Sequence, residues 1–197
     1  MVIFTNIYDE DTKNVADKNG TDLDVASSQA AFPSTSDRLS LAAVNALETV
    51  EGAKGTGGIA THVERKSRYL VAAKLVDKKA ATMNAQSIKF FWKIPQVMRQ
   101  TLTVDNGKEF SQFKELESKT GLKVYFADPY AAWQRGTNEN TNGLLRHYFP
   151  KGINFQTVSE EELDQIVKKV NHRPRKCLDY RTPHEVFNQA SSGALTM

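Results

Sequence analysis

Two carboxylates flanking a short α/β segment are the residues of this chain best suited to chemistry. Asp105 follows the β-prone run Gln100–Val104, which Asn106-Gly107 ends because both residues tolerate positive φ. Glu139 comes 34 residues later, near the start of a predicted helix. Carboxylate oxygens suit Mg²⁺ or Mn²⁺, and two such ions serve phosphoryl transfer. The residue types alone are more typical of two solvated surface acids than of a metal site.

The segment between these carboxylates predicts a helix followed by a strand. A helix is expected from about Lys108 to Lys119, with its apolar residues on one face and a glycine stop at Gly121. The next run, Leu122–Ala127, alternates apolar and polar residues as a half-buried strand does. The inward positions are Phe110, Phe113 and Leu116 on the helix, and Leu122, Val124 and Phe126 on the strand.

The flanking sequence predicts an α/β fold with a mixed central sheet and helices on both faces. Three strands come first and form a meander, and helices alternate with strands after it. The expected strands are Thr49–Glu51, Ile59–Glu64 and Tyr69–Leu75, and the expected helices are Ala80–Trp92, Glu160–Asn171 capped by Ser159, and one beginning at Thr182-Pro183. A short helix is also possible over Ser36–Leu47, with Leu39, Ala43 and Leu47 on one face.

Composition narrows the class of protein. The chain has 197 residues, enough for one ordinary domain plus a tail. A single cysteine, Cys177, excludes a disulfide framework and a cysteine-based zinc site, and no apolar run or signal peptide indicates a membrane partner. Residues 1–48 carry eight acidic and three basic residues, so the net charge of +3 hides a basic body. A basic body suits a polyphosphate partner.

Several other segments contain residues that can bind phosphate or metal, but their spacing does not fit such a site. The glycine-rich turn Gly52–Gly58 lacks the glycine and lysine spacing of a P-loop. His62 and Glu64 share a strand face and are expected to be structural or solvated. His172 and His184 lack a spacing that fits a zinc site.

Four motifs in order resemble the catalytic core of bacterial insertion-sequence transposases with a DDE triad, close to the insertion-sequence-thirty family, and more distantly that of retroviral integrases. They are ETVEGAKGTGGIATHVERKSRYL (Glu48–Leu70), VDNGKEF (Val104–Phe110), RGTNENTNGLLRHYFPKG (Arg135–Gly152) and NHRPRKCLDYRTPHEVF (Asn171–Phe187). The resemblance implies a ribonuclease-H-like fold and metal-dependent DNA strand cleavage and transfer, that is, DNA transposition and integration.

The resemblance also assigns residues. It places the catalytic and metal-binding positions at Asp105, Glu139 and Glu48, with two Mg²⁺ or Mn²⁺ ions in the active state and a shallow acidic pocket between Asp105 and Glu139. The family's basic residue seven positions after its glutamate falls on Arg146. The expected partner is double-stranded DNA, as transposon ends and target, in the bacterial cytoplasm near the nucleoid, and assembly into a homo-oligomer is left open. The expected DNA-binding residues are Arg135, Asn138, Asn142, Arg146, Lys151, Arg173 and Arg175.

The sequence departs from the family at its amino-terminal end. Glu48 stands where the family has aspartate, and residues 1–47 lack a helix-turn-helix pattern. We therefore expect an acidic, disordered or non-homologous segment over 1–47, a core over 48–190 with a truncated first strand, and a flexible tail over 191–197. A truncated transposase with impaired activity is the expected function. A catalytically inactive DNA-binding remnant and a stand-alone nuclease of the same fold are the alternatives.

Overall fold

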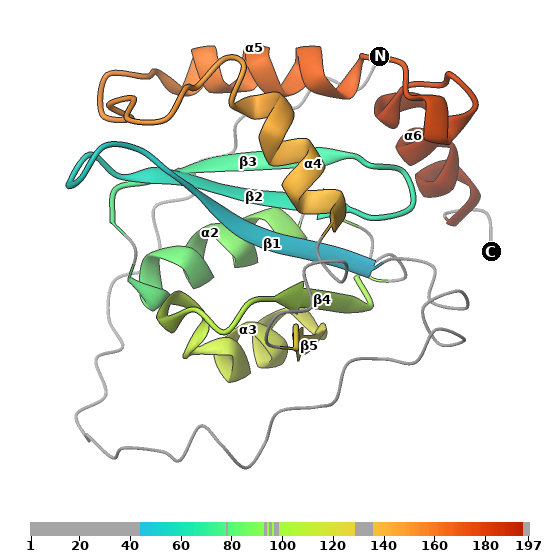
Figure 1. The fold of residues 1–197 in the computed structure, drawn as a ribbon. Helices are drawn as coiled ribbons and strands as arrows, with labels where there is room; N and C mark the ends of the chain where they lie inside the picture. Colours follow the sequence, from blue (N-terminus) through green and yellow to red (C-terminus); the bar gives the residue numbers. More distant parts are fainter. Residues whose placement is uncertain are drawn as a thin grey trace.

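A five-stranded mixed sheet forms the centre of the molecule, with strand order β3-β2-β1-β4-β5 (Figure 1). The computed structural model describes residues 44–77, 79–92, 94, 96, 99–128 and 136–194. The strands are β1 (Val44–Glu51), β2 (Gly58–Glu64), β3 (Leu70–Leu75), β4 (Thr101–Val104) and β5 (Lys123–Phe126). The first three pair antiparallel as the predicted meander, whereas β4 pairs parallel with both β1 and β5.

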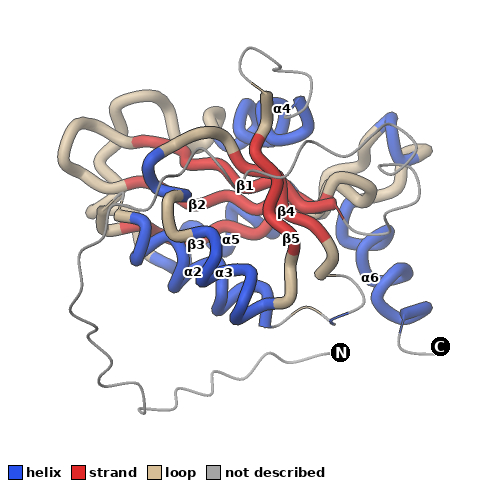
Figure 2. Tube along the Cα trace, turned by 90° about the horizontal axis from the view of Figure 1, so that it is seen from below, coloured by secondary structure: helices blue, strands red, loops and turns tan. Residues whose placement is uncertain are grey.

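Helices cover both faces of this sheet, as the sequence predicted. They are α2 (Ala80–Trp92), α3 (Phe113–Thr120), α4 (Gly136–Leu145), α5 (Glu160–Asn171) and α6 (Pro183–Ala194), with 3-10 turns η3 (Lys108–Phe110) and η5 (Lys176–Leu178). Figure 2 shows α2 and α3 side by side across one face, with α4 on the other side of the sheet. In the described residues, no helix is both long and apolar enough to cross a membrane.

Two hydrophobic cores result, one on each face. Leu47, Leu102 and Val104 pack with α2 and α3 in the first core. Val50 and Ile59 pack with apolar residues of α4 and α5 in the second. Because successive strand residues point to opposite faces, Leu47 and Val50 belong to different cores. The face covered by α4 and α5 is therefore the one that even-numbered residues of β1 reach.

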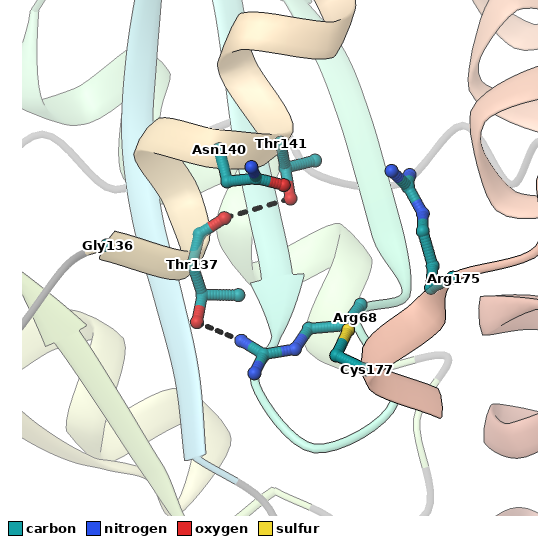
Figure 3. Close-up of a pocket in the computed structure, with 7 residues that line it drawn as sticks. All are labelled: Arg68, Gly136, Thr137, Asn140, Thr141, Arg175 and Cys177. Carbon is teal, nitrogen blue, oxygen red and sulfur yellow. Dashed lines mark hydrogen bonds between the residues drawn. The ribbon is translucent and has the colours of Figure 1, made fainter. Parts of the chain in front are cut away.

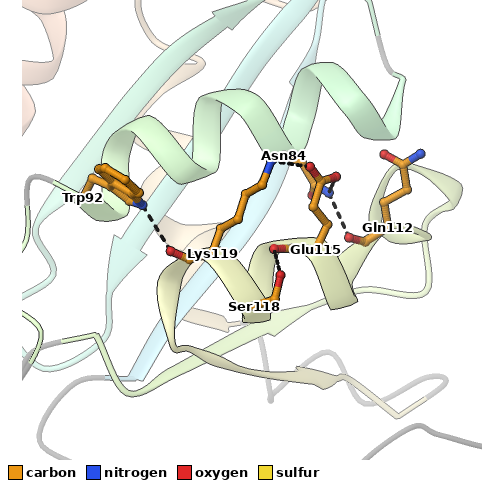
Figure 4. A network of polar contacts seen from close by, with 6 residues as sticks. All are labelled: Asn84, Trp92, Gln112, Glu115, Ser118 and Lys119. Carbon is orange, nitrogen blue, oxygen red and sulfur yellow. Dashed lines mark hydrogen bonds and ion pairs between the residues drawn. The ribbon is translucent and has the colours of Figure 1, made fainter. Parts of the chain in front are cut away.

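The segment after Asp105 is more broken than predicted. The expected helix over Lys108–Lys119 is a 3-10 turn, η3, followed by α3, but Phe110, Phe113 and Leu116 are all buried as predicted. Gly121 ends α3 in the left-handed region at φ 73°. Polar contacts fix α3 against α2: the Asn84 amide donates to the Gln112 carbonyl at 2.8 Å and the Trp92 indole to the Lys119 carbonyl at 3.2 Å (Figure 4).

The first strand is longer than predicted, and this corrects two expectations. β1 begins at Val44, so Val44–Leu47 lie in the sheet and not in the helix considered over Ser36–Leu47. Ala46 and Leu47 are 1% exposed and pair with Val63 and His62 of β2. Burial on both faces removes the apolar alternation that marks a strand in sequence. The strand that carries Glu48 is therefore not a stub, and the core begins before residue 48.

The other elements follow the sequence closely. The Ser159 hydroxyl caps α5 by accepting from the Glu162 backbone N–H at 3.0 Å, and Leu163, Ile166 and Val170 are buried. α6 runs to Ala194, past the predicted core boundary at 190. His62 and Glu64 are structural, as expected. The Glu64 carboxylate accepts from the backbone N–H groups of Lys66 and Ser67 at 2.8 and 2.6 Å.

Candidate active site

Glu48 lies on the face of β1 that α4 covers. Glu48 and Val50 are two positions apart in the strand and therefore point to the same face, and Val50 packs in the core beneath α4 and α5. The side-chain amide of Asn142 on α4 donates a 2.6 Å hydrogen bond to Oε2 of Glu48. This contact fixes one carboxylate oxygen of Glu48 and joins the first strand to the helix that carries Glu139.

Asp105 follows directly after β4, beside Glu48. The parallel register pairs Val44 with Thr101 and Ala46 with Thr103, and two further residues along each strand bring Glu48 level with Asp105. In-register residues on neighbouring strands point to the same face, and the strands lie about 4.8 Å apart. Asp105 Oδ1 accepts a 3.0 Å hydrogen bond from the backbone N–H of Gly107, so the Asn106-Gly107 turn orients the carboxylate.

Glu139 lies in the first turn of α4 and is exposed. It shares a helix face with Asn142 and Arg146, because residues three and seven positions apart lie on one side of a helix. In the described part of the chain, no three His, Cys, Asp or Glu side chains come close enough together to hold a metal ion. The expected acidic pocket between Asp105 and Glu139 stays a prediction.

The structure corrects the role expected for Asn138. Its side chain is 0% exposed, on the buried face of α4 with Thr141 and Leu145, and so cannot reach DNA in this conformation. Within the described part of the chain, neither its amide nitrogen nor its carbonyl oxygen has a hydrogen-bond partner. The run of asparagines in this helix gave no indication of which one faces inward.

The other predicted DNA-binding residues differ in how accessible they are. Arg146 is half-buried, and its guanidinium donates to the Glu51 carbonyl at 2.9 Å and the Phe149 carbonyl at 3.5 Å. Lys151 and Arg173 are exposed, and Asn142 is half-buried against Glu48. Arg135 lies outside the described residues. The DNA-binding role of this set stays a prediction.

Arg175 is the member of the set in the most constrained position. Its Nη2 donates to the Val170 carbonyl at 3.2 Å, and its own backbone closes the turn that leads to Arg181. Burial, and to a lesser extent the nearby charge of Arg173, lower the pKa of Arg175. It lines a pocket with Arg68 and Thr137, two residues that the sequence did not single out. Only the positive charge of Arg68, in the tight connection Arg65–Arg68, could have drawn attention to it.

Several known proteins with sequences similar to this chain are transposases. No protein-family model matches the chain. It is 43% identical over 142 residues to the transposase InsI for insertion sequence element IS30A of Escherichia coli, a match that covers 72% of this chain and 37% of that protein. It is also 43% identical to the transposase for IS1086 of Cupriavidus metallidurans and 40% identical to that for IS4351 of Bacteroides fragilis. The chain thus spans roughly two-fifths of the length of these curated relatives.

The fold agrees with this relationship. The catalytic core domain of BIV integrase superposes with a TM-score of 0.60 at 17% identity, over 77% of this chain and 97% of the integrase domain. That likeness shows the fold, a ribonuclease-H-like α/β arrangement. Over the matched segment, the chain is a homologue of IS30-family insertion-sequence transposases, built on the fold of an integrase catalytic core.

Proposed function

We propose that this chain carries the catalytic domain of a transposase, which cuts and joins double-stranded DNA with the help of divalent metal ions. The observation that carries the proposal is the placement of Glu48 level with Asp105, on a sheet face crossed by the helix that bears Glu139. Its transposase relatives support the reaction class. Activity, DNA substrate and any assembly with further copies of the chain are parts of this proposal.

The residues at this position fit Mg²⁺ or Mn²⁺. All three side chains offer carboxylate oxygens, the ligands that these hard cations prefer, and none offers the thiolate or imidazole that favours zinc. Glu48, Asp105 and Glu139 would hold the ions. When bound, the ions supply activation of the attacking oxygen and charge stabilisation of the leaving oxygen of a phosphodiester.

The neighbouring groups orient these carboxylates. The Asn142 amide holds Oε2 of Glu48, and the Gly107 backbone N–H holds Oδ1 of Asp105. Such supporting hydrogen bonds commonly change metal affinity or activity by about 10–100-fold when they are removed. Arg146 directly follows α4, seven positions after Glu139, and would steer a DNA phosphate toward the carboxylates.

Glu48 sets the expected level of activity. Glutamate is one methylene longer than the aspartate of the family, and a displacement of about 1 Å can cost roughly a hundredfold in rate. The sequence also suggested a second defect, a truncated first strand, but β1 spans Val44–Glu51 and pairs along its whole length with β2 or β4. The side-chain length of Glu48 is therefore the defect that remains.

A strand-transfer assay tests the proposal. The chain as given is expected to join a labelled DNA end to a target weakly in Mn²⁺ and more weakly in Mg²⁺. Glu48→Asp should raise the rate about 10–100-fold, and Asp105→Asn in that background should abolish it. A rate that Asp105→Asn leaves unchanged would exclude this active site.

The alternative of a DNA-binding remnant without catalysis is favoured by a single observation, the glutamate at position 48. It makes a different prediction in the same assay. A remnant would bind duplex DNA yet stay inactive in Mn²⁺ even as Glu48→Asp, whereas the transposase proposal requires that this variant regain strand transfer.

A further inference from the structure

A pocket of about 410 Å³ lies between α4 and the turns that carry Arg68, Arg175 and Cys177 (Figure 3). α4 forms one wall with side chains that share the helix face opposite Asn142. The other wall comes from two turns far apart in sequence, the β2–β3 connection and the segment before α6. The lining residues are Gly136, Thr137, Asn140 and Thr141 from α4, and Arg68, Arg175 and Cys177 from the turns.

The two turns that supply the arginines are conformationally unusual. Arg68, Asp179 and Tyr180 are the non-glycine residues with positive φ in the described chain, at 63°, 54° and 61°. Arg68 lies in the first turn, and the other two lie in the turn that Arg175 opens. Left-handed conformations cost about 1–2 kcal/mol for such residues and occur often at binding sites. Strain is thus concentrated in the two turns that supply the pocket's charge.

Among the described residues, no carboxylate neutralises the positive charge of this pocket, and none of its lining residues is acidic. The ion pairs recorded in the described residues are Lys79–Asp77 and Lys119–Glu115, so neither arginine takes part in one there. Arg68 donates instead to the neutral hydroxyl of Thr137, and Arg175 to a backbone carbonyl. An arginine has five N–H donors, so each keeps donors for a ligand.

A second pocket continues this charge along the surface. Its volume is about 340 Å³, and it shares Arg175 with the first pocket. His147, Lys169 and Arg173 add basic side chains, and Tyr148 adds a ring that is 44% exposed. We call these two pockets, which meet at Arg175, the basic groove, defined by Arg68, Arg175, Arg173 and Lys169.

We propose that this groove binds the phosphodiester backbone of a DNA strand, with the Arg68–Arg175 pocket taking one phosphate and the Arg173–Lys169 pocket a neighbouring one. This rests on the proposed function, because it supplies a path for the DNA that the domain acts upon. Guanidinium groups bind phosphate through paired N–H donors, and Thr137 and Asn140 add neutral donors beside them.

Metal-free DNA binding tests the groove separately from catalysis. A short labelled duplex of arbitrary sequence is titrated in EDTA over a range of salt concentrations. Arg68→Gly removes the guanidinium and keeps the turn, because glycine adopts positive φ without cost. We expect Arg68→Gly and Arg173→Ala each to weaken binding about three- to tenfold and to lower the salt dependence by roughly one phosphate contact.

Lys114→Ala is the matched control, an exposed lysine on α3 whose loss changes the net charge equally. Both groove variants behaving like Lys114→Ala would overturn the proposal. Binding of inorganic phosphate at millimolar concentration that depends on Arg68, with duplex affinity unaffected by Arg68→Gly, would also overturn it, in favour of a small-anion site. Asp105→Asn should abolish strand transfer and leave metal-free DNA binding unchanged. The catalytic proposal and the groove proposal can therefore fail independently of one another.

Discussion

The side-chain amide of Asn142 donates a 2.6 Å hydrogen bond to the carboxylate of Glu48, joining α4 to β1 across 94 positions of sequence. Glu139 lies one turn earlier on the same helix face. The hydrogen bond therefore positions two carboxylate-bearing elements relative to one another. Asn142 therefore has a structural role within the protein, in addition to the DNA contact that the sequence suggested.

Asn142→Ala is expected to lower divalent-metal affinity and strand transfer on the order of tenfold, because it removes the donor that orients Glu48. Metal titration and the strand-transfer rate in Mn²⁺ measure the effect in the chain as given, because the Glu48 side chain itself makes the contact. Asn188→Ala, at an exposed asparagine of α6, is the control and should change neither quantity. Equal behaviour of the two variants would show that the contact has no influence on the site.

Gly107→Ala should impair the same site from the other strand. A Cβ at this position would lie 2.9 Å from Asp105 Oδ1, the oxygen that the Gly107 N–H holds, and 2.5 Å from a carboxylate oxygen of Glu109. We expect at least a tenfold loss of strand transfer from displacement of the Asp105 carboxylate.

The control for Gly107→Ala is Gly143→Ala on α4, where a Cβ meets nothing within 4 Å. That variant should keep its activity and gain about 0.5–1 kcal/mol in the free energy of unfolding, since alanine is the better helix former. Full activity of Gly107→Ala would contradict the orienting role of the turn.

The burial of Asn138 predicts how substitutions at this position change stability. Its amide is buried and has no hydrogen-bond partner among the residues that the structure describes, which costs about 1–3 kcal/mol. Asn138→Leu keeps a similar shape and should raise the midpoint of thermal unfolding, whereas Asn138→Asp should lower it strongly by burying an unpaired charge. Asn140→Asp, at an exposed position two residues on, should change the midpoint little. A lower midpoint for Asn138→Leu would show that the amide has a stabilising partner.

Local patterns predicted most of the fold. Phe110, Phe113 and Leu116 lie on a helical period and are all buried, and the alternation of Val124 and Phe126 marked β5 correctly. Val44–Leu47 were misread because β1 is buried on both faces, so Ala46 and Leu47 lack the polar alternation of a surface strand. The spacing of Leu39, Ala43 and Leu47 then suggested a helix.

The geometry of the site depended on pairings that no local pattern encodes. The position of Glu48 beside Asp105 follows from the parallel register of β1 and β4. These two strands are separated by about fifty residues of sequence, so tertiary packing sets their register. The groove at Arg68 and Arg175 joins two turns, and turns carry no periodic signal. Asn138 was assigned to DNA because three asparagines precede Arg146, but the helical register directs this one into the core.

Stability should fall in mild acid because of His62. The ring is buried among Phe90, Phe91 and Ser87, and burial lowers its pKa from 6.5 to about 3. Between these pH values the unfolded state binds a proton that the folded state does not, so stability is full above pH 6.5 and is lost as the pH falls toward 3. Urea unfolding should show a loss of about 2 kcal/mol from pH 7 to pH 5 attributable to this residue.

His62→Gln should remove this part of the pH dependence, although the variant is less stable overall. His147→Gln, at an exposed histidine after α4, is the control and should keep it. The same pH dependence in wild type and His62→Gln would show that another group is responsible.

Binding of Mn²⁺ to the metal-free chain, measured by titration calorimetry, tests most directly whether Glu48, Asp105 and Glu139 act as one site. Asp105→Asn, Glu139→Gln and Glu48→Gln should each remove the same binding event, because a carboxamide is a neutral and weaker ligand than a carboxylate. Glu48→Asp should tighten it. Mn²⁺ binding that is unchanged in Asp105→Asn and in Glu139→Gln would contradict a shared metal site on this face of the sheet.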